Sequence, residues 1–136
     1  MKYLVTGVAG FIGYHTAKRL LKNNNEIIGI DNINDFYDIN LKNARLKELS
    51  KHENFNFHDT DLTNKSDVLN LQNEDKIDAI IHLAAYAGVR ISLSDPWAYQ
   101  ENNVTATLNL LELCKISNIK NFTLASTSSV YGDNKT

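Results

Sequence analysis

Three glycines lie in the segment Gly7-Val8-Ala9-Gly10-Phe11-Ile12-Gly13, between a short apolar run and a helical pattern. Gly7 permits a tight turn there, Gly10 lets the backbone approach a pyrophosphate, and Gly13 lets the helix pack closely on the strand. Amides at the start of the helix then face the phosphates, at the positive end of the helix dipole. The GxxGxxG spacing is weak evidence by itself, because three glycines can also merely form a turn.

An acidic residue strengthens this interpretation. Asp31 ends the next apolar run and lies 18 residues after Gly13. A carboxylate at about this distance binds the ribose hydroxyls of a dinucleotide. A free carboxylate there would repel a 2′-phosphate, so we expect NAD rather than NADP. The alternative is that Asp31 only caps the following segment.

Further candidate cofactor ligands follow later apolar runs, at the strand ends where open α/β sheets bind ligands. Asp61 could accept a hydrogen bond from an adenine amino group while Leu62 packs on the ring; the alternative is that Asp61 caps a turn. The small residues of Leu83-Ala84-Ala85 would let a cofactor lie close over the sheet. We interpret His82, inside its apolar run, as a core histidine with its hydrogen bonds satisfied.

Two polar clusters lie further along the chain. Asparagine is a poor helix former, so the pair Asn102-Asn103 in the middle of a long helical pattern needs a reason. We expect Asn102 to hydrogen-bond the cofactor or a neighbouring loop; a solvated helix face is the alternative. The segment Ser126-Thr127-Ser128-Ser129 presents four hydroxyls beyond the last apolar run. They suit a sugar hydroxyl or a carboxylate, or local turn bonds alone.

Apolar runs and helical patterns alternate along the chain. We expect strands at 2–6, 26–30, 54–58, 77–83 and 120–125. We expect helices at 11–23, 41–51 and 67–72, and a long one from Asp95-Pro96 to about 117, since Asp caps helices and Pro favours their first position. The apolar positions of the first two helices are Ile12, Ala17, Leu20 and Leu21, and Leu41, Ala44, Leu46 and Leu49.

This alternation predicts an α/β fold with a parallel sheet covered on both faces. Right-handed crossovers then give a Rossmann-type doubly wound sheet with strand order 3-2-1-4-5. We assign residues 1–136 to one incomplete domain of this type.

Composition places the chain among ordinary globular domains: 136 residues, 43% hydrophobic and 22% charged, with a net charge of −2. A nucleic-acid binder usually carries a basic face, so we expect no such partner. No run approaches the ~18 apolar residues of a membrane span. The run from Tyr3 to Val5 is too short for a signal peptide, so we expect a cytoplasmic protein. We expect Cys114 to be a small core hydrophobe, and we expect no metal site.

The chain resembles the extended short-chain dehydrogenase/reductase superfamily of NAD-dependent epimerases and dehydratases. The segments LVTGVAGFIG, GIDNIND, HDTDLT, IIHLAAYAGVR and LASTSSVYG carry the resemblance and follow the order of the family. Within the superfamily the chain most resembles the UDP-glucuronate 4-epimerases. The details are Asp31-Asn32 followed by residues 33–38, and residues 87–90 with Ser92 and Pro96.

The resemblance implies 4-epimerisation of UDP-glucuronate to UDP-galacturonate through a transient 4-keto intermediate. It implies that Thr127 hydrogen-bonds the sugar 4-hydroxyl, and that Ser128, Ser129 and Arg90 bind the nucleotide-sugar substrate. It implies a homodimer through a pair of helices, one of them the long helix. With the glycine loop and Ala85, it gives an NAD site lined by Gly7, Gly10, Phe11, Ile12, Gly13, Asp31, Asn32, Asp61, Leu62, Leu83, Ala84, Ala85 and Asn102.

Two departures from related enzymes bear on the reaction. Related 4,6-dehydratases carry Asp-Glu directly after the corresponding threonine, whereas Ser128-Ser129 offers no carboxylate, which favours epimerisation over dehydration. Galactose-type epimerases carry a lysine near the cofactor where this chain has Ala87.

Tyr131 and Lys135 match the family's Tyr-x-x-x-Lys pair literally, but the Gly-Asp-Asn between them indicates a turn. We therefore expect a chain truncated before the last strands, the catalytic pair and the substrate domain, inactive alone and binding NAD weakly. The alternatives are a nucleotide-sugar dehydratase or reductase, and a non-catalytic NAD-binding protein.

Overall fold

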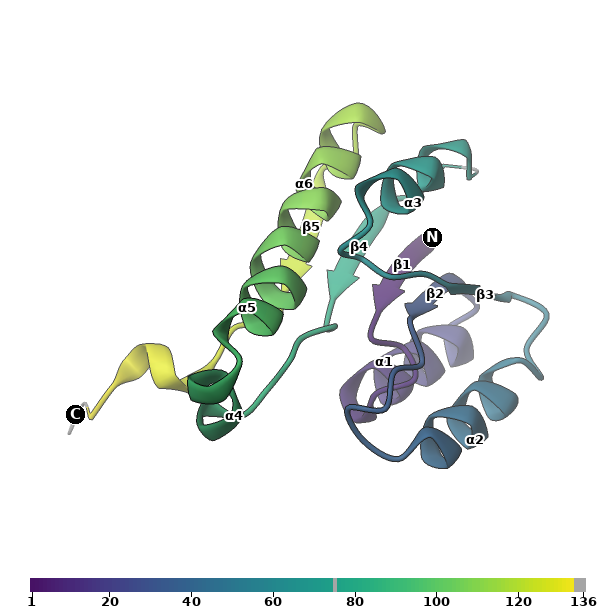
Figure 1. Ribbon diagram of the computed structural model, residues 1–136. Coiled ribbons are helices and arrows are strands. Elements are labelled where there is room, and N and C mark those ends of the chain that lie inside the picture. Colours follow the sequence, from purple (N-terminus) through teal and green to yellow (C-terminus); the bar gives the residue numbers. More distant parts are fainter. Residues whose placement is uncertain (75, 134–136) are drawn as a thin grey trace.

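The computed structural model describes residues 1–74 and 76–133 and contains one parallel sheet of five strands. The strand order β3-β2-β1-β4-β5 confirms the predicted doubly wound Rossmann-type arrangement (Figure 1). Every neighbouring pair is parallel. The strands are β1 (Lys2–Thr6), β2 (Glu26–Asp31), β3 (Phe55–Asp59), β4 (Ala79–His82) and β5 (Asn121–Leu124).

Helices connect the strands, and most of their ends lie within two residues of the prediction. The exception among the elements is α4, a short helix that the apolar pattern did not predict. The helices are α1 (Phe11–Lys22), α2 (Ile39–Leu49), α3 (Lys65–Asn70), α4 (Val89–Ser94), α5 (Pro96–Tyr99) and α6 (Ala106–Ile116), with the 3₁₀ turns η1 (Leu71–Asn73) and η3 (Ser128–Tyr131) and the π-helical turn η2 (Gln100–Thr105).

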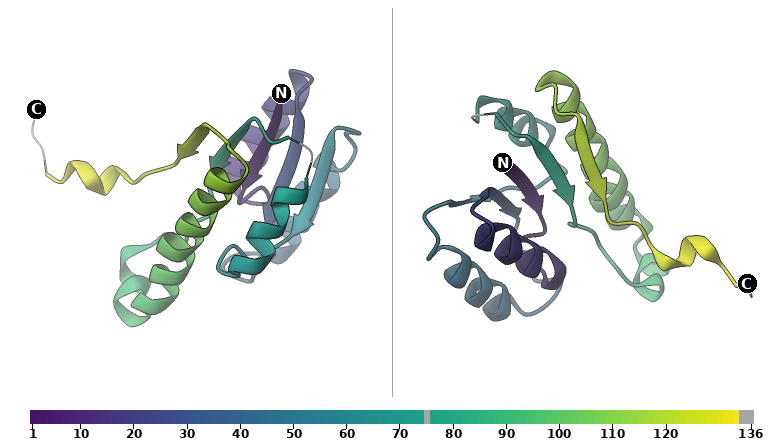
Figure 2. Two further views of the ribbon diagram at one scale, coloured as in Figure 1. Left: turned by 90° about the horizontal axis from the view of Figure 1, so that it is seen from above. Right: turned by 180° about the vertical axis from the view of Figure 1, so that it is seen from behind.

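The sheet separates two apolar layers, because successive side chains of a strand point to opposite faces. On β1, Leu4 joins a cluster with residues of α3 and α6, whereas Val5 joins a cluster with residues of α1 and α2. Figure 2 shows these two pairs of helices on opposite faces of the sheet. The carboxyl ends of the strands therefore form one uncovered edge between the layers.

The predicted apolar faces of the first two helices are wrong in part. Ile12 is 61% exposed, because the first turn of α1 extends past the sheet, and Tyr14 is buried instead. In α2, Leu41 and Ala44 are exposed, while Lys42 is only 4% exposed. A charged residue thus faces inward where the apolar pattern predicted leucine, because its partner lies on β2.

The long helix begins as predicted. The Asp95 carboxylate accepts a hydrogen bond from the Ala98 amide at 3.1 Å, with Pro96 at the first helical position. The helix then runs through α5, η2 and α6, and the wider π-helical turn η2 contains both Asn102 and Asn103. Such turns occur frequently at functional sites.

Cys114 lies in the apolar layer between the sheet and α6, as predicted. Burial raises the pKa of its thiol, which makes the reactive thiolate less accessible. Within residues 1–74 and 76–133, no helix has both the length and the apolar character that a membrane crossing needs.

His82 is a core histidine, as predicted, and is 1% exposed. Its Nδ1 and Nε2 atoms lie 2.7 Å and 3.0 Å from the hydroxyl oxygens of Thr6 and Thr107. Burial lowers its pKa from 6.5 to about 4, because the protonated ring would lose its hydration. The neutral His82 ring therefore contributes stability that is fully present above pH 6.5 and is lost as the pH falls from 6.5 to about 4.

We expect this loss to approach ~3 kcal/mol of the free energy of unfolding near pH 4. Urea titrations between pH 7.5 and 4.5 measure it. The variant His82→Gln should lose most of the pH dependence, whereas the matched variant His52→Gln should keep it. An unchanged pH dependence in His82→Gln would show that other groups are responsible.

Candidate functional site

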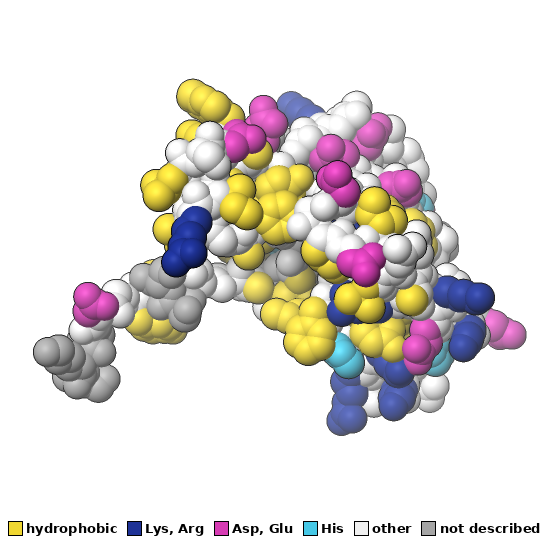
Figure 3. Space-filling model, turned by 60° about the horizontal axis from the view of Figure 1, so that its bottom comes forward, with side chains coloured by type: hydrophobic (Ala, Val, Ile, Leu, Met, Phe, Trp, Pro, Cys, Tyr) yellow, Lys and Arg dark blue, Asp and Glu magenta, His cyan; other side chains and the backbone are white. Residues whose placement is uncertain are grey.

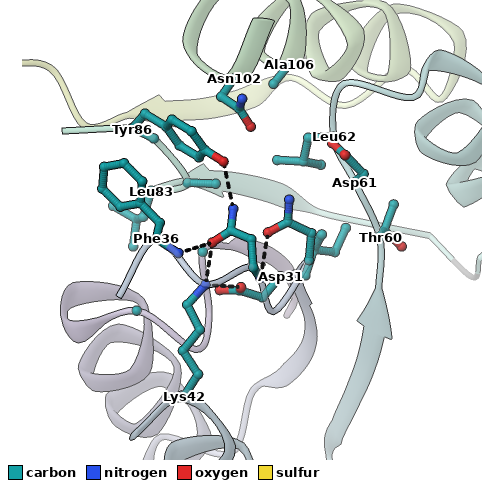
Figure 4. A pocket seen from close by; sticks show the side chains of 17 residues that line it. Asp31, Phe36, Lys42, Thr60, Asp61, Leu62, Leu83, Tyr86, Asn102 and Ala106 are labelled. Atoms are coloured by element: carbon teal, nitrogen blue, oxygen red, sulfur yellow. Dashed lines mark hydrogen bonds and ion pairs between the residues drawn. The ribbon is translucent and has the colours of Figure 1, made fainter. Parts of the chain in front are cut away.

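A cleft opens at the carboxyl ends of β1, β2, β3 and β4. Figure 3 looks toward this edge and shows exposed hydrophobic side chains along it, with Lys and Arg gathered on the side of α1 and α2. The lining comes from the glycine loop, the loops that follow β2, β3 and β4, and the helices α2, η2 and α6 (Figure 4).

The cleft brings together most of the predicted cofactor residues, which are far apart in sequence. Those that line it are Gly7, Gly10, Asp31, Asn32, Asp61, Leu62, Leu83, Ala84, Ala85 and Asn102. Phe11 and Ile12 do not line it; they lie in the exposed first turn of α1. Gly13 lies beneath the loop, against Gly7.

The glycine loop leaves no room for a side chain at any of its three glycines; a Cβ on Gly10 would lie 2.9 Å from the Gly7 carbonyl oxygen. Gly7 has φ +64°, and a Cβ there would lie 2.9 Å from the Ala84 backbone. A Cβ on Gly13 would overlap the carbonyl oxygen of Gly7. Within the described chain, α1 begins without a side-chain cap and without an acidic residue in its first turn. The first helical amides lack intrahelical acceptors, so this end of α1 fits a diphosphate.

The Asp31 carboxylate makes three contacts at the end of β2. Its Oδ2 accepts a hydrogen bond from the Ala9 amide at 3.1 Å, and its Oδ1 accepts one from the Ile33 amide at 3.1 Å. Lys42 Nζ lies 3.3 Å from Oδ1 in an ion pair that is almost fully buried. The premise that this carboxylate is free is therefore wrong, because Lys42 balances the charge that was expected to repel a 2′-phosphate.

A second cation lies beside the glycine loop. Arg45 Nη1 and the Tyr37 hydroxyl both donate to the Ala9 carbonyl oxygen, at 3.1 Å and 2.9 Å. The Arg45 guanidinium also lies 5.9 Å from the centre of the Phe11 ring. Burial raises the pKa of Tyr37, so its hydroxyl stays protonated and can donate. These contacts fix the loop carbonyl and place positive charge near the start of α1.

Asp61 and Leu62 occupy the predicted end of β3. Asp61 Oδ1 accepts hydrogen bonds from the amide and the hydroxyl of Thr63, at 2.9 Å and 2.8 Å, so Asp61 does cap a turn. It also lines the cleft, and its described hydrogen bonds all use Oδ1, which leaves acceptor capacity on Oδ2. Asn109 of α6 holds the Leu62 carbonyl at 2.9 Å. The adenine contact stays a prediction.

The two roles predicted for Asn102, a contact with the cofactor or with a neighbouring loop, fall to different asparagines. Asn103 binds the neighbouring loop: its Oδ1 accepts from the Tyr86 amide at 2.7 Å, and its Nδ2 donates to the Tyr86 carbonyl at 3.0 Å. Asn102 lines the cleft while its Nδ2 donates to the Ala98 carbonyl at 2.9 Å (Figure 4). The contact with the loop therefore belongs to Asn103, and Asn102 keeps the role of candidate cofactor ligand.

Two of the residues predicted to contact the sugar nucleotide lie apart from the cleft. Arg90 is exposed on α4, and Thr127 is exposed beyond β5; neither lines the cleft. Ser128 and Ser129 begin η3, and their side chains lie outside the described part of the structure, as does Lys135. Tyr131 is 75% exposed, and Gly132 follows it with φ +59°, in agreement with the predicted turn.

Several residues that line the cleft were not predicted from the sequence. The missed residues are Ile30, Asn34, Phe36, Lys42, Thr60, Tyr86 and Ala106. Two signals were available: Asn34 and Phe36 belong to the segment that carries the resemblance, and Tyr86 directly follows Leu83-Ala84-Ala85. Burial raises the pKa of Tyr86, and the nearby carboxylates of Asp61 and Asp35 add to the shift.

Comparison with known proteins agrees with this geometry. A UDP-glucuronate 4-epimerase from Thermodesulfobacterium geofontis is 54% identical over 95% of this chain and 40% of its own length. Protein CapI from Staphylococcus aureus is 45% identical over 98% of this chain and 40% of its own length. The crystal structure of UDP-glucuronic acid 4-epimerase from Bacillus cereus in complex with UDP-glucuronic acid and NAD superposes with a TM-score of 0.88 at 41% identity.

The superposition covers all of this chain and 43% of the Bacillus cereus chain. The chain thus spans about 40% of the length of the curated relatives it matches. A family model described as GDP-mannose 4,6 dehydratase matches residues 4–136. The chain therefore belongs to this dehydratase family, which confirms the predicted membership of the superfamily of NAD-dependent epimerases and dehydratases.

Proposed function

We propose that this chain is the NAD-binding part of a nucleotide-sugar 4-epimerase. The observation that carries the proposal is the start of α1, uncapped and lying behind Gly7 and Gly10 at the edge of a cleft that also contains Asp31. A dinucleotide would place its diphosphate at the start of α1. Its adenine-side ribose would meet Asp31 Oδ2, which accepts one described hydrogen bond and can accept another.

The relatives support the substrate class. The Bacillus cereus enzyme is described in complex with UDP-glucuronic acid and NAD, and the Thermodesulfobacterium relative is a UDP-glucuronate 4-epimerase. We propose UDP-glucuronate as the substrate and UDP-galacturonate as the product. A homodimer through the long helix belongs to the same proposal, supported by the exposed side chains of Val104, Leu108 and Leu111.

The proposed chemistry is a transient oxidation of the sugar at C4. NAD, when bound, would supply the reversible acceptor for the hydride of that carbon. We assign Thr127 to the hydrogen bond with the sugar 4-hydroxyl and to helping to shuttle its proton. Ser128, Ser129 and Arg90 would bind the rest of the substrate. Asp31, Asn32, Asp61 and Asn102 would hold the cofactor in a fixed orientation over the sheet.

Dehydration is the competing reaction within this family, since the matching family model is described as a dehydratase. Elimination of water needs an acid and a base beside the threonine, as the related dehydratases have. Ser128 and Ser129 follow Thr127 here, and a serine hydroxyl cannot replace a carboxylate in that role at neutral pH. This difference favours epimerisation.

The isolated chain gives a first test of the proposal. We expect residues 1–136 to bind NAD in a calorimetric titration but to convert no UDP-glucuronate. The helical Tyr-x-x-x-Lys pair of the described chain, Tyr14 and Lys18 on α1, does not line the cleft, and Lys18 pairs with Glu48 instead. Chromatography of the nucleotide sugars measures turnover. Detectable UDP-galacturonate would contradict the expectation that residues 1–136 alone cannot carry out the reaction.

A chimera tests the reaction itself. Residues 1–136 replace the matching part of the Bacillus cereus enzyme, and the products from UDP-glucuronate are separated by chromatography. We expect UDP-galacturonate. A chimera that folds and binds NAD but forms a dehydrated product would overturn the assignment of an epimerase.

A further inference from the structure

Two aromatic side chains from opposite sides of the cleft stack on each other. Phe36 lies in the loop between β2 and α2, and Tyr86 lies in the loop between β4 and α4. Their ring centroids are 4.4 Å apart with an interplanar angle of 28°. Asn34 Nδ2 also donates to the Tyr86 hydroxyl oxygen at 3.1 Å (Figure 4). Because β2 and β4 flank β1, these contacts join the two sides of the cleft. We call Asn34, Phe36 and Tyr86 the clasp.

Each half of the clasp is anchored to a helix. Lys42 of α2 donates to Asn34 Oδ1 at 2.9 Å and pairs with Asp31. On the other side, Asn103 of η2 holds the Tyr86 backbone through two hydrogen bonds. The weakest connection across the cleft is therefore the ring stack and the single hydrogen bond from Asn34, not the attachment of either loop.

The loop on the β2 side is also held in a strained conformation. Ile33 has φ +45°, in the left-handed region that β-branched residues avoid. Such a residue persists only where the surroundings fix it. The Ile33 amide donates to Asp31, and Asn34, its neighbour, is held by Lys42 and Tyr86. The loop conformation thus depends on the residues that line the cleft.

We propose that the clasp retains the dinucleotide in its cleft and sets the rate at which it dissociates. The inference rests on the proposed function. Asn34, Phe36 and Tyr86 all line the cleft together with Gly10 and Asp61. A dinucleotide that extends from the glycine loop to Asp61 lies beneath the clasp and cannot leave until the stack parts. Retention suits an epimerase, because the reaction returns its NAD to the starting state in every turnover.

The closed clasp also slows entry, and this gives the proposal a distinctive kinetic signature. An aromatic pair and one neutral hydrogen bond are each modest interactions, so we expect an effect of roughly tenfold on each rate. Opening the clasp by Phe36→Leu or Tyr86→Leu should accelerate both association and dissociation, and leave the dissociation constant nearly unchanged. Simple loss of a ligand contact would accelerate dissociation alone.

Stopped-flow measurement of NADH binding, with the nicotinamide fluorescence excited directly, tests this expectation. Phe36→Tyr keeps the stack and should keep the wild-type rates, and Tyr86→Phe, which loses only the hydroxyl, should give intermediate rates. Trp97→Leu, a change of an aromatic residue exposed on α5, is the matched control and should behave as wild type. Circular dichroism confirms that each variant is folded.

The outcomes separate the two proposals. Faster association and faster dissociation in both leucine variants support the clasp. If the wild-type protein binds NADH but the leucine variants show an unchanged dissociation rate, the clasp alone is overturned. Faster dissociation with an unchanged association rate also overturns the clasp alone. Absence of dinucleotide binding in the wild-type protein overturns the proposed function together with the clasp.

Discussion

The variant Gly13→Val should lose both its NAD binding and much of its stability. A Cβ on Gly13 would overlap the Gly7 carbonyl oxygen and lie 2.7 Å from the Gly7 carbonyl carbon. Overpacking usually costs ~1–3 kcal/mol, and we expect more here because the obstructing atoms are backbone atoms that cannot change rotamer. Relief would require α1 to move away from β1, which would displace its amides from the cleft. Urea titration and NAD calorimetry measure the two effects.

The matched control is Gly132→Asn. Gly132 has φ +59° and no atoms within 4 Å of the position of a Cβ, and asparagine tolerates this conformation. Its free energy of unfolding should stay within ~0.5 kcal/mol of wild type, as for most surface substitutions. If Gly13→Val bound NAD with the wild-type affinity, the close contact between α1 and the glycine loop would not be needed for NAD binding.

The second large effect concerns the ion pair in the cleft. The variant Asp31→Leu removes the partner of Lys42, which is only 4% exposed, and leaves a buried ammonium with Asn34 as its remaining described acceptor. Breaking a buried pair in this way costs ~3–5 kcal/mol. We expect a loss of that size in the free energy of unfolding, together with loss of NAD binding.

The double variant Asp31→Leu, Lys42→Met separates the two consequences. Replacing both members of a buried pair by apolar residues is often neutral for stability, so the double variant should regain part of the lost free energy of unfolding. It should not regain all of it, because the Ala9 and Ile33 amides would still lack the acceptor that Asp31 provides. It should not regain NAD binding, because the ribose would still lack its acceptor. Equal stability of Asp31→Leu and the double variant would mean that the ion pair does not carry this effect.

The framework of the fold could be predicted because it is encoded locally. Short apolar runs and helical patterns alternate, and right-handed crossovers leave few arrangements for five parallel strands. The glycine loop could be predicted for a similar reason, since its turn and close packing are set by three residues within one segment. Gly7 and Gly13 indeed lie where a Cβ would collide with neighbouring backbone.

The parts that could not be predicted depend on contacts between distant residues. Lys42 lies on a largely polar helix, and only its pairing with Asp31 on β2 turns it inward. The stacking of Phe36 on Tyr86 joins loops from two separate βα units, and no periodicity encodes it. The π-helical turn is likewise invisible to a 3.6-residue pattern, although the asparagine pair within it signalled that this part of the helix was unusual.

The most direct measurement is a crystal structure of the protein soaked with NAD. We expect the diphosphate to lie against the amides at the start of α1, the adenine-side ribose within hydrogen-bond distance of Asp31 Oδ2, and the adenine ring beside Leu62. An empty cleft at saturating NAD, in a protein shown to be folded, would contradict the account, and so would a dinucleotide bound elsewhere on the chain.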